Sequence, residues 1–210
     1  AQEVQLSVRF KKIEALTEVL LPDLTELAPA ELQAQYSDSR QQLEVHGIFP
    51  RIAYAGNRLD SLRVDIQGNQ RQLSGRLALD EVGLSDGSSL DQTLLSSTLR
   101  NDSLRFQFRL SDRNEADSIF SKLAFGGLVR ASNRRASLHF DPEFYLNGGR
   151  WQISPEHRLE WGENDLKISG LQFQRRDQRL VLQSRRTPSP GDLSPIELAF
   201  TNFRLTELSE

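Results

Sequence analysis

The stretch Leu104–Leu110, which reads Leu-Arg-Phe-Gln-Phe-Arg-Leu, decides the fold that we predict for this chain. Leu104, Phe106, Phe108 and Leu110 are apolar, and an arginine or a glutamine separates each from the next. Successive side chains of a β-strand point to opposite faces of a sheet. The stretch therefore predicts a strand with one apolar face and one polar face.

The same alternation extends in both directions from this strand, and turn residues interrupt it about every ten residues. Examples are the alternating run 62–66 and the turn sequences Ser85-Asp86-Gly87 and Asn147-Gly148-Gly149. We predict an all-β fold, in which a long antiparallel sheet curls into a U-shaped groove, or β-taco, with an apolar interior. The groove spans residues 1–210 as a single segment.

Two parts of the chain depart from this pattern. Between residues 13 and 34, leucine and isoleucine recur three or four residues apart, which is typical of an amphipathic helix. Because Pro22 and Pro29 interrupt the run, we predict short helices instead of one long helix. The stretch 187–194 is rich in proline, serine and glycine and predicts a long hairpin loop.

Composition excludes several classes of function. The chain has 210 residues, a net charge of -3 and no cysteine, so a disulfide, a thiolate zinc site and a thiol nucleophile are all absent. No run reaches the about 18 apolar residues that a transmembrane helix needs. Only 37% of residues are hydrophobic, as expected for a sheet with one face in water.

The sequence offers little chemistry for catalysis or metal binding. The three histidines, His46, His139 and His157, form no zinc-protease motif, and no serine lies in a nucleophile elbow. His139, Asp141 and Glu143 are spaced two apart, but a strand whose other face is buried would point all three to water. We predict no catalytic residue, no metal site and no cofactor.

Short basic clusters occur at the arginine pairs 134–135, 175–176 and 185–186. Acidic residues lie near them, and no aromatic residues alternate with them to form a base-stacking platform. We predict a solvated polar sheet face and no nucleic-acid partner.

A sheet with one apolar face must cover that face, since a monomer seldom leaves more than a few hundred Å² of apolar surface in water. It can fold into a sandwich or barrel, or curl around an apolar ligand. We favour the second, because the sequence shows no second layer apart from the short helices. Phospholipid acyl chains would fill such a groove, each buried CH₂ contributing about 0.8 kcal/mol. The predicted lining residues are Leu104, Phe106, Phe108, Leu110, Phe125, Leu138, Phe140, Leu171 and Phe173.

Both ends of the chain contain strand-like sequence that could form open sheet edges. The N-terminal edge would consist of Val4, Leu6, Val8 and Phe10. The C-terminal edge would consist of Ile196, Leu198 and Phe200. Such edges could pair with client strands or join two copies of the chain into a dimer.

Most of the chain resembles the TamB family of translocation and assembly module proteins, which belongs to the AsmA-like group. The resemblance is to the form found in Bacteroidota, and it lies in residues 21–62, 104–112 and 123–185. The most telling part runs through successive hairpins and includes the segment 151–155, which reads W-x-I-x-P. Its residues are Leu138, Phe140, Asp141, Leu146, Trp151, Pro155, Leu159, Leu166 and Phe173. The chain departs from the family pattern at His157, where asparagine is expected, and this departure concerns a turn.

The resemblance implies a segment of a large protein anchored in the inner membrane of a Gram-negative bacterium. Such proteins cross the periplasm towards an outer-membrane barrel protein of the BamA or TamA kind. The implied function is phospholipid transport between the two membranes through a hydrophobic groove. One alternative is a scaffold for outer-membrane protein assembly, and a second is a structural β-sandwich module. The chain would be an interior fragment that lacks both the anchor and the region that contacts the barrel.

Overall fold

The structure, a computed structural model, describes residues 2–11, 23–113, 119–132, 135–162, 165–185 and 195–202. Seventeen strands and no helix occupy these residues, and the strand pairings among them are antiparallel. The predicted all-β, antiparallel class is therefore confirmed. The chain divides into two compact units, of which unit 1 comprises Ala1–Asn101 and Phe108–Ile119, and unit 2 comprises Asp102–Gln107 and Phe120–Glu210.

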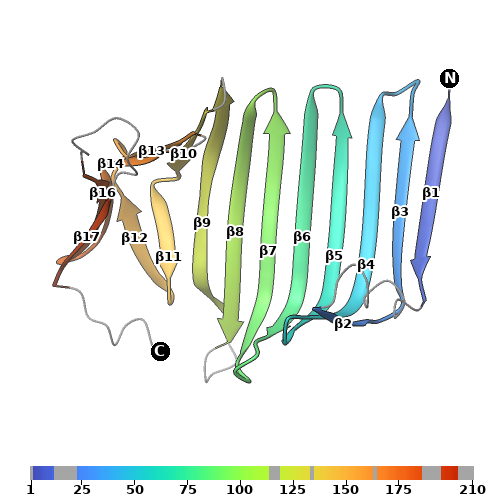
Figure 1. The fold of residues 1–210 in the computed structure, drawn as a ribbon, viewed down its shortest axis with the longest axis horizontal. Coiled ribbons are helices and arrows are strands. Elements are labelled where there is room, and N and C mark those ends of the chain that lie inside the picture. Colours follow the sequence, from blue (N-terminus) through green and yellow to red (C-terminus); the bar gives the residue numbers. More distant parts are fainter. Residues whose placement is uncertain are drawn as a thin grey trace. The chain divides into compact units, whose positions relative to one another are not determined.

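Unit 1 is built on a regular meander in which neighbouring strands lie side by side (Figure 1). Its consecutive strands are β1 (Glu3–Phe10), β3 (Ala30–Ser37), β4 (Gln42–Tyr54), β5 (Asn57–Asn69), β6 (Gln72–Gly83) and β7 (Ser89–Arg100). The short strand β2 (Leu24–Leu27) pairs with the end of β4. Strands β8 (Ser103–Arg113) and β9 (Ile119–Ser132) contribute residues to both units.

The predicted helices are wrong for every described part of residues 24–34, because this part of the chain forms β2 and β3. Residues 12–22 lie outside the described residues. In β3, Leu32 lies opposite Val8 of β1 on one side and Gly47 of β4 on the other. Pairing along both edges satisfies the backbone groups of β3 and outweighs the helix propensity of its alanine, leucine and glutamine residues.

Two predicted turns are confirmed. Gly87 has a φ of 89° in the turn between β6 and β7, and the Asp86 carboxylate accepts a 2.9 Å hydrogen bond from the Ser88 backbone N–H. Asn147 and Gly148 both have positive φ, which asparagine and glycine adopt most readily. The predicted loop at 187–194 lies outside the described residues.

Unit 2 is a branched sheet that starts from β9. Its other strands are β10 (Arg135–Phe140), β11 (Glu143–Leu146), β12 (Gly149–Ile153), β13 (Arg158–Trp161), β14 (Leu166–Ser169), β15 (Leu171–Arg175), β16 (Gln178–Ser184) and β17 (Ile196–Thr201). One half of β9 pairs with β10, which continues to β13 and β14. The other half pairs with β11, which continues through β12, β15 and β16 to β17. The branches meet again where the Ile168 N–H donates to the Ser184 hydroxyl at 2.8 Å.

The two branches of unit 2 enclose a hydrophobic core. Ile153, Ile168 and Leu171 form its centre and are only 3%, 6% and 3% exposed. Phe140, Phe144, Leu159, Phe173 and Leu182 pack around them. In the described part of unit 1, by contrast, Ala30 is the one buried apolar side chain. The apolar side chains of unit 2 therefore form a packed core, whereas those of unit 1 form an open face.

Candidate functional site

One face of unit 1 is apolar across six neighbouring strands. Residues paired across strands share a face, and so do residues two apart along a strand. The strand register then gives three rows: Val8, Leu32, Gly47, Val64, Leu77 and Leu95; Leu6, Ala34, Val45, Ile66, Gly75 and Ser97; and Val4, Tyr36, Leu43, Gly68, Leu73 and Leu99. Seventeen of these eighteen positions hold glycine, alanine, valine, leucine, isoleucine or tyrosine. The exception is Ser97, which lies opposite Gly75.

The opposite face of the same strands is polar. Arg9 pairs with Glu31 across β1 and β3, and Arg63 contacts Asp80 across β5 and β6. These side chains are 41–70% exposed, as expected for ion pairs in water, which contribute little to stability.

The apolar face of unit 1 is open to solvent in the described structure. Val4, Leu6 and Leu99 are 57%, 54% and 41% exposed, and the other apolar side chains in the three rows are exposed or half-buried. Sheets in globular proteins normally bury such a face against a second layer. A contiguous exposed apolar face of this kind is typical of interaction surfaces and ligand-binding grooves.

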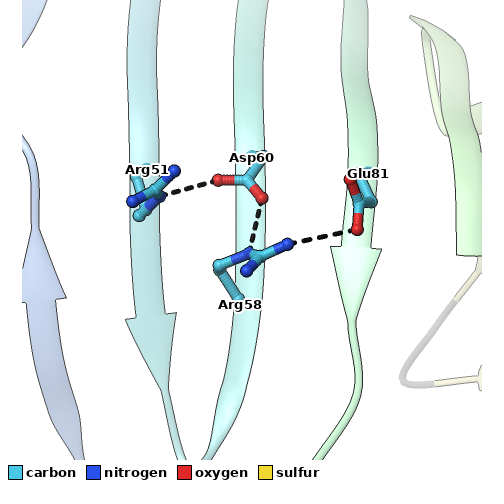
Figure 2. Close-up of polar contacts among 4 residues, drawn as sticks. All are labelled: Arg51, Arg58, Asp60 and Glu81. Carbon is cyan, nitrogen blue, oxygen red and sulfur yellow. Dashed lines mark hydrogen bonds and ion pairs between the residues drawn. The ribbon is translucent and has the colours of Figure 1, made fainter. Parts of the chain in front are cut away.

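A charged cluster borders this face where β4, β5 and β6 approach their ends (Figure 2). The register continues from Phe49 opposite Leu62 to Arg51 opposite Asp60. The Asp60 carboxylate accepts hydrogen bonds from Arg51 at 2.9 Å and from Arg58 at 2.6 Å.

Arg58 also reaches Glu81 on the next strand, at 3.1 Å, so the four charges form one chain across three strands (Figure 2). Burial opposes ionisation of Asp60, but the hydrogen bonds and charges of Arg51 and Arg58 outweigh it and lower the pKa of Asp60. The cluster ends the apolar surface with a set of charges that neutralise one another.

We expect Asp60→Asn to lower the free energy of unfolding of unit 1 by about 1 kcal/mol, because two arginines lose their anionic acceptor. Since the folded pKa of Asp60 is lowered, its contribution is present above an ordinary pKa of 3.8 and is lost as the pH falls through the folded value. Hydrogen exchange of the β5 amides at neutral pH measures the change. Asp80→Asn is the control, because Asp80 is 52% exposed and should cost less. Equal effects of the two substitutions would contradict the prediction.

Unit 2 contains an apolar pocket of about 340 Å³. Its lining residues are Leu123, Phe125, Phe140, Phe144, Leu146, Trp151, Ile153, Phe173, Leu180 and Phe200. Trp151 and Ile153 are 3% exposed, whereas Phe200 is 53% exposed. The pocket therefore extends from the solvent towards the core, and every side chain that lines it is apolar.

A cross-strand row forms one wall of this pocket. Ile153 lies opposite Phe173, Phe173 opposite Leu180, and Leu180 opposite Phe200, across β12, β15, β16 and β17. Phe144 meets Phe173 edge to face, with ring centroids 5.4 Å apart. An edge-to-face contact between two aromatic rings adds to the stabilisation that comes from burying their apolar surface.

Phe125 and Phe140 line another part of the pocket. Phe125 lies 6.1 Å from Phe106 and 6.2 Å from Phe140, both in edge-to-face contact. Gly127 makes this approach possible, since a Cβ there would lie 2.7 Å from the His139 carbonyl oxygen and 3.3 Å from the Phe106 ring.

The structure brings some of the predicted lining residues together. Phe125, Phe140 and Phe173 line the pocket, and Phe106 supports it from behind Phe125. Leu171 instead lies at the centre of the core, and Leu138 is half-buried opposite Leu159 and Val129. The remaining predicted residues on β8 are half-buried and lie outside the pocket lining: Leu104, Phe108 and Leu110.

The two predicted edge strands form as strands β1 and β17. In β1, Val4 and Leu6 are exposed, while Val8 and Phe10 are half-buried, and no described strand of unit 1 lies on the side away from β3 (Figure 1). In β17, Ile196, Leu198 and Phe200 are each about half exposed and lie opposite Ser184, Leu182 and Leu180 of β16.

An ion pair links β17 to Arg185, the residue that follows β16. Arg185 donates to Glu197 at 2.7 Å, and hydrogen bonds from Arg185 and Gln183 lower the pKa of Glu197 to about 2. Glu197 is therefore ionised at any physiological pH.

The candidate ligand cluster at 139–143 does not converge. His139 donates to the His157 carbonyl oxygen at 3.1 Å, Asp141 accepts from Arg105 at 2.9 Å, and Glu143 contacts Arg150. Among the residues that the structure describes, no group of three potential metal ligands comes together.

The predicted lining residues leave out most of the pocket and the open face of unit 1, of which only Val4, Leu6 and Val8 were predicted, as residues of an edge strand. Trp151, Ile153 and Phe144 follow the same period-two pattern as the predicted lining residues, and so do Val45 and Val64. The signal was present, but alternation alone does not say which apolar face is covered.

No described helix is long and apolar enough to cross a membrane. Comparison of the chain with family models, with curated proteins and with solved structures gave no match.

Proposed function

We propose that this chain is a non-enzymatic segment of a TamB-like protein that binds phospholipid acyl chains along its apolar sheet surface. The observation that carries the proposal is the open face of unit 1, with three apolar rows in register across six strands. A flexible hydrocarbon chain can lie along such a surface without specific polar partners, gaining about 0.8 kcal/mol for each CH₂ that it buries.

The pocket of unit 2 supports the same proposal. It is lined by apolar side chains alone, and it reaches from the half-exposed Phe200 to the buried Trp151 and Ile153. Ligand pockets normally carry a few polar groups that orient the ligand. Their absence from this lining suits the hydrocarbon tail of a lipid, whose head group would remain outside.

In the full-length protein, we propose, this surface curls into a U-shaped groove that conducts phospholipid through the periplasm between the inner and outer membranes. The protein would be anchored in the inner membrane and would meet a BamA- or TamA-like barrel through parts outside this chain. Sequence resemblance supports this placement, and the open apolar face gives it a physical basis.

Replacing Leu77 by glutamate should reduce binding of a phosphatidylcholine with a fluorescent acyl chain by about tenfold or more, because a charge beside hydrocarbon costs several kcal/mol. Ala78→Glu is the matched control, because Ala78 is the next residue on β6 and lies opposite Arg63 on the polar face. Both variants should retain the circular dichroism of a β-protein. Equal binding by the two folded variants would overturn the proposal for unit 1.

A second candidate function is a scaffold for outer-membrane protein assembly, favoured by the edge of β1. Leu6 is 54% exposed there, and the strand could pair with a client by β-augmentation. A photo-crosslinker at Ser7 should capture an unfolded outer-membrane protein if the scaffold function is correct. The same crosslinker at Gln35, on neighbouring β3, is the control, because β3 pairs along both edges. Capture at both positions, or at neither, would contradict this function.

A further inference from the structure

His157 packs beside Phe140, one of the residues that line the unit 2 pocket. Its side chain is only 2% exposed and follows the turn between β12 and β13. The imidazole stacks on His139, with ring centroids 4.2 Å apart and planes 9° from parallel. It also lies 5.9 Å from the ring of Phe140, which lines the pocket.

Both ring nitrogens of His157 are engaged. The Phe140 backbone N–H donates to Nε2 at 2.7 Å, so Nε2 carries no proton. Nδ1 then carries the proton and donates to the Ser154 carbonyl oxygen. This pair of bonds requires the neutral ring, because an imidazolium has no acceptor.

Protonation would set two donors against each other. A proton on Nε2 would face the Phe140 N–H, and the hydrogen bond between them would be lost. The new positive charge would be buried against His139, the titratable group that faces the ring from β10. The charged residues Glu156 and Arg158 flank His157 along the chain, and Gly170 lies across the turn, where a Cβ would come within 3.6 Å of the His157 Cα.

We propose that neutral His157 is a latch that holds Phe140 in the pocket wall, and that protonation of His157 releases a bound acyl chain. This inference rests on the proposed function, because it assigns a regulator to the same pocket. His157 is not among the residues that line the pocket and would act through Phe140, so it is a positioning residue. It would make lipid release respond to acidity without any group that touches the lipid changing its charge.

The direction of the effect follows from the surroundings of the ring. Burial lowers the pKa of His157 below its ordinary value of 6.5, the hydrogen bond to Ser154 opposes this shift, and the charge of His139 adds to it. The closed wall is therefore fully stable above pH 6.5 and weakens as the pH falls through the folded pKa of His157.

The test measures binding of a phosphatidylcholine with a fluorescent acyl chain from about pH 7.5 down to about pH 4.5, a range in which histidine changes charge. This head group keeps its charge throughout, so any change belongs to the protein. Wild-type affinity should fall about threefold or more, and approach a tenfold loss per pH unit below the folded pKa, as expected for uptake of one proton.

Two variants identify the group responsible. His157→Gln keeps a side-chain acceptor for the Phe140 N–H but does not titrate, so its affinity should depend less on pH. His139→Gln is the matched control, because His139 is exposed and its loss leaves both hydrogen bonds of the His157 ring in place. Its affinity should still fall as the pH falls, with the midpoint displaced to higher pH, because the charge of His139 no longer lowers the pKa of His157.

The outcomes separate the latch from the proposed function. If the wild type fails to bind at about pH 7.5, where histidine is mainly neutral, the lipid-binding proposal fails and the latch as a regulator fails with it. Binding that is independent of pH would overturn the latch alone, as would a full pH dependence in His157→Gln. If His157→Gln does not fold, NMR of the wild type decides, because the Phe140 amide resonance must titrate together with the His157 ring.

Discussion

Replacing Trp151 by alanine should lower the free energy of unfolding of unit 2 by about 3–5 kcal/mol. Trp151 is 3% exposed, lies opposite Phe144 in the β11–β12 hairpin and lines the deep end of the pocket. Its removal would leave a large cavity beside Ile153, which the surrounding strands cannot close without breaking their register. The expected loss is a large share of the stability of a small domain.

Trp161→Ala is the matched control for this substitution. Trp161 is 37% exposed and lies on β13 opposite Leu166, so its truncation should cost about 1 kcal/mol or less. Both tryptophans belong to unit 2, and each variant keeps one of them, so urea denaturation followed by fluorescence reports on this unit in both cases. Similar losses for the two variants would contradict the tighter packing of Trp151.

Leu171→Ala should cost about 2–5 kcal/mol of unfolding free energy, although the sequence pattern predicts Leu171 to be a lipid contact. The structure places it 3% exposed in the core with Ile153 and Ile168. Its main contribution is therefore to packing. The folded variant should bind fluorescent phosphatidylcholine about as well as the wild type.

Leu166→Ala provides the comparison, because Leu166 is 37% exposed on β14. We expect it to cost less than about 1 kcal/mol. Urea denaturation and lipid binding measured on the same samples separate the two roles. If Leu171→Ala abolished lipid binding while leaving stability unchanged, Leu171 would be a lining residue and not a core residue.

Alternation predicted the strands well, because it depends only on neighbours along the chain. The runs around Val64 and Phe106 are strands, and within each the apolar and polar residues fall on opposite faces. The predicted helices near Leu24 and Leu32 were wrong, since the edges of β1 and β4 offer these residues backbone partners that no local pattern reveals.

The candidate site was predicted only in part for the same reason. Phe125, Phe140 and Phe173 were selected for their alternation, and they meet in one pocket. Leu171 shares their pattern but is buried, because the two branches of unit 2 meet over it. His157 was noted only as a turn residue, and its bond to Phe140 spans seventeen positions in the sequence.

The sequence by itself determined that this chain forms antiparallel strands with one apolar face, because apolar and polar residues alternate along the chain with the two-residue period of a strand. Only the tertiary structure decided which apolar faces are buried. In unit 2, β9 pairs with two different strands and the branches close over Ile153 and Ile168. The described strands of unit 1, in contrast, pair with the next strand along the chain or with the one after it. Covering an apolar face requires contacts between residues distant along the chain. The alternation of apolar and polar residues is a local pattern and does not specify those contacts.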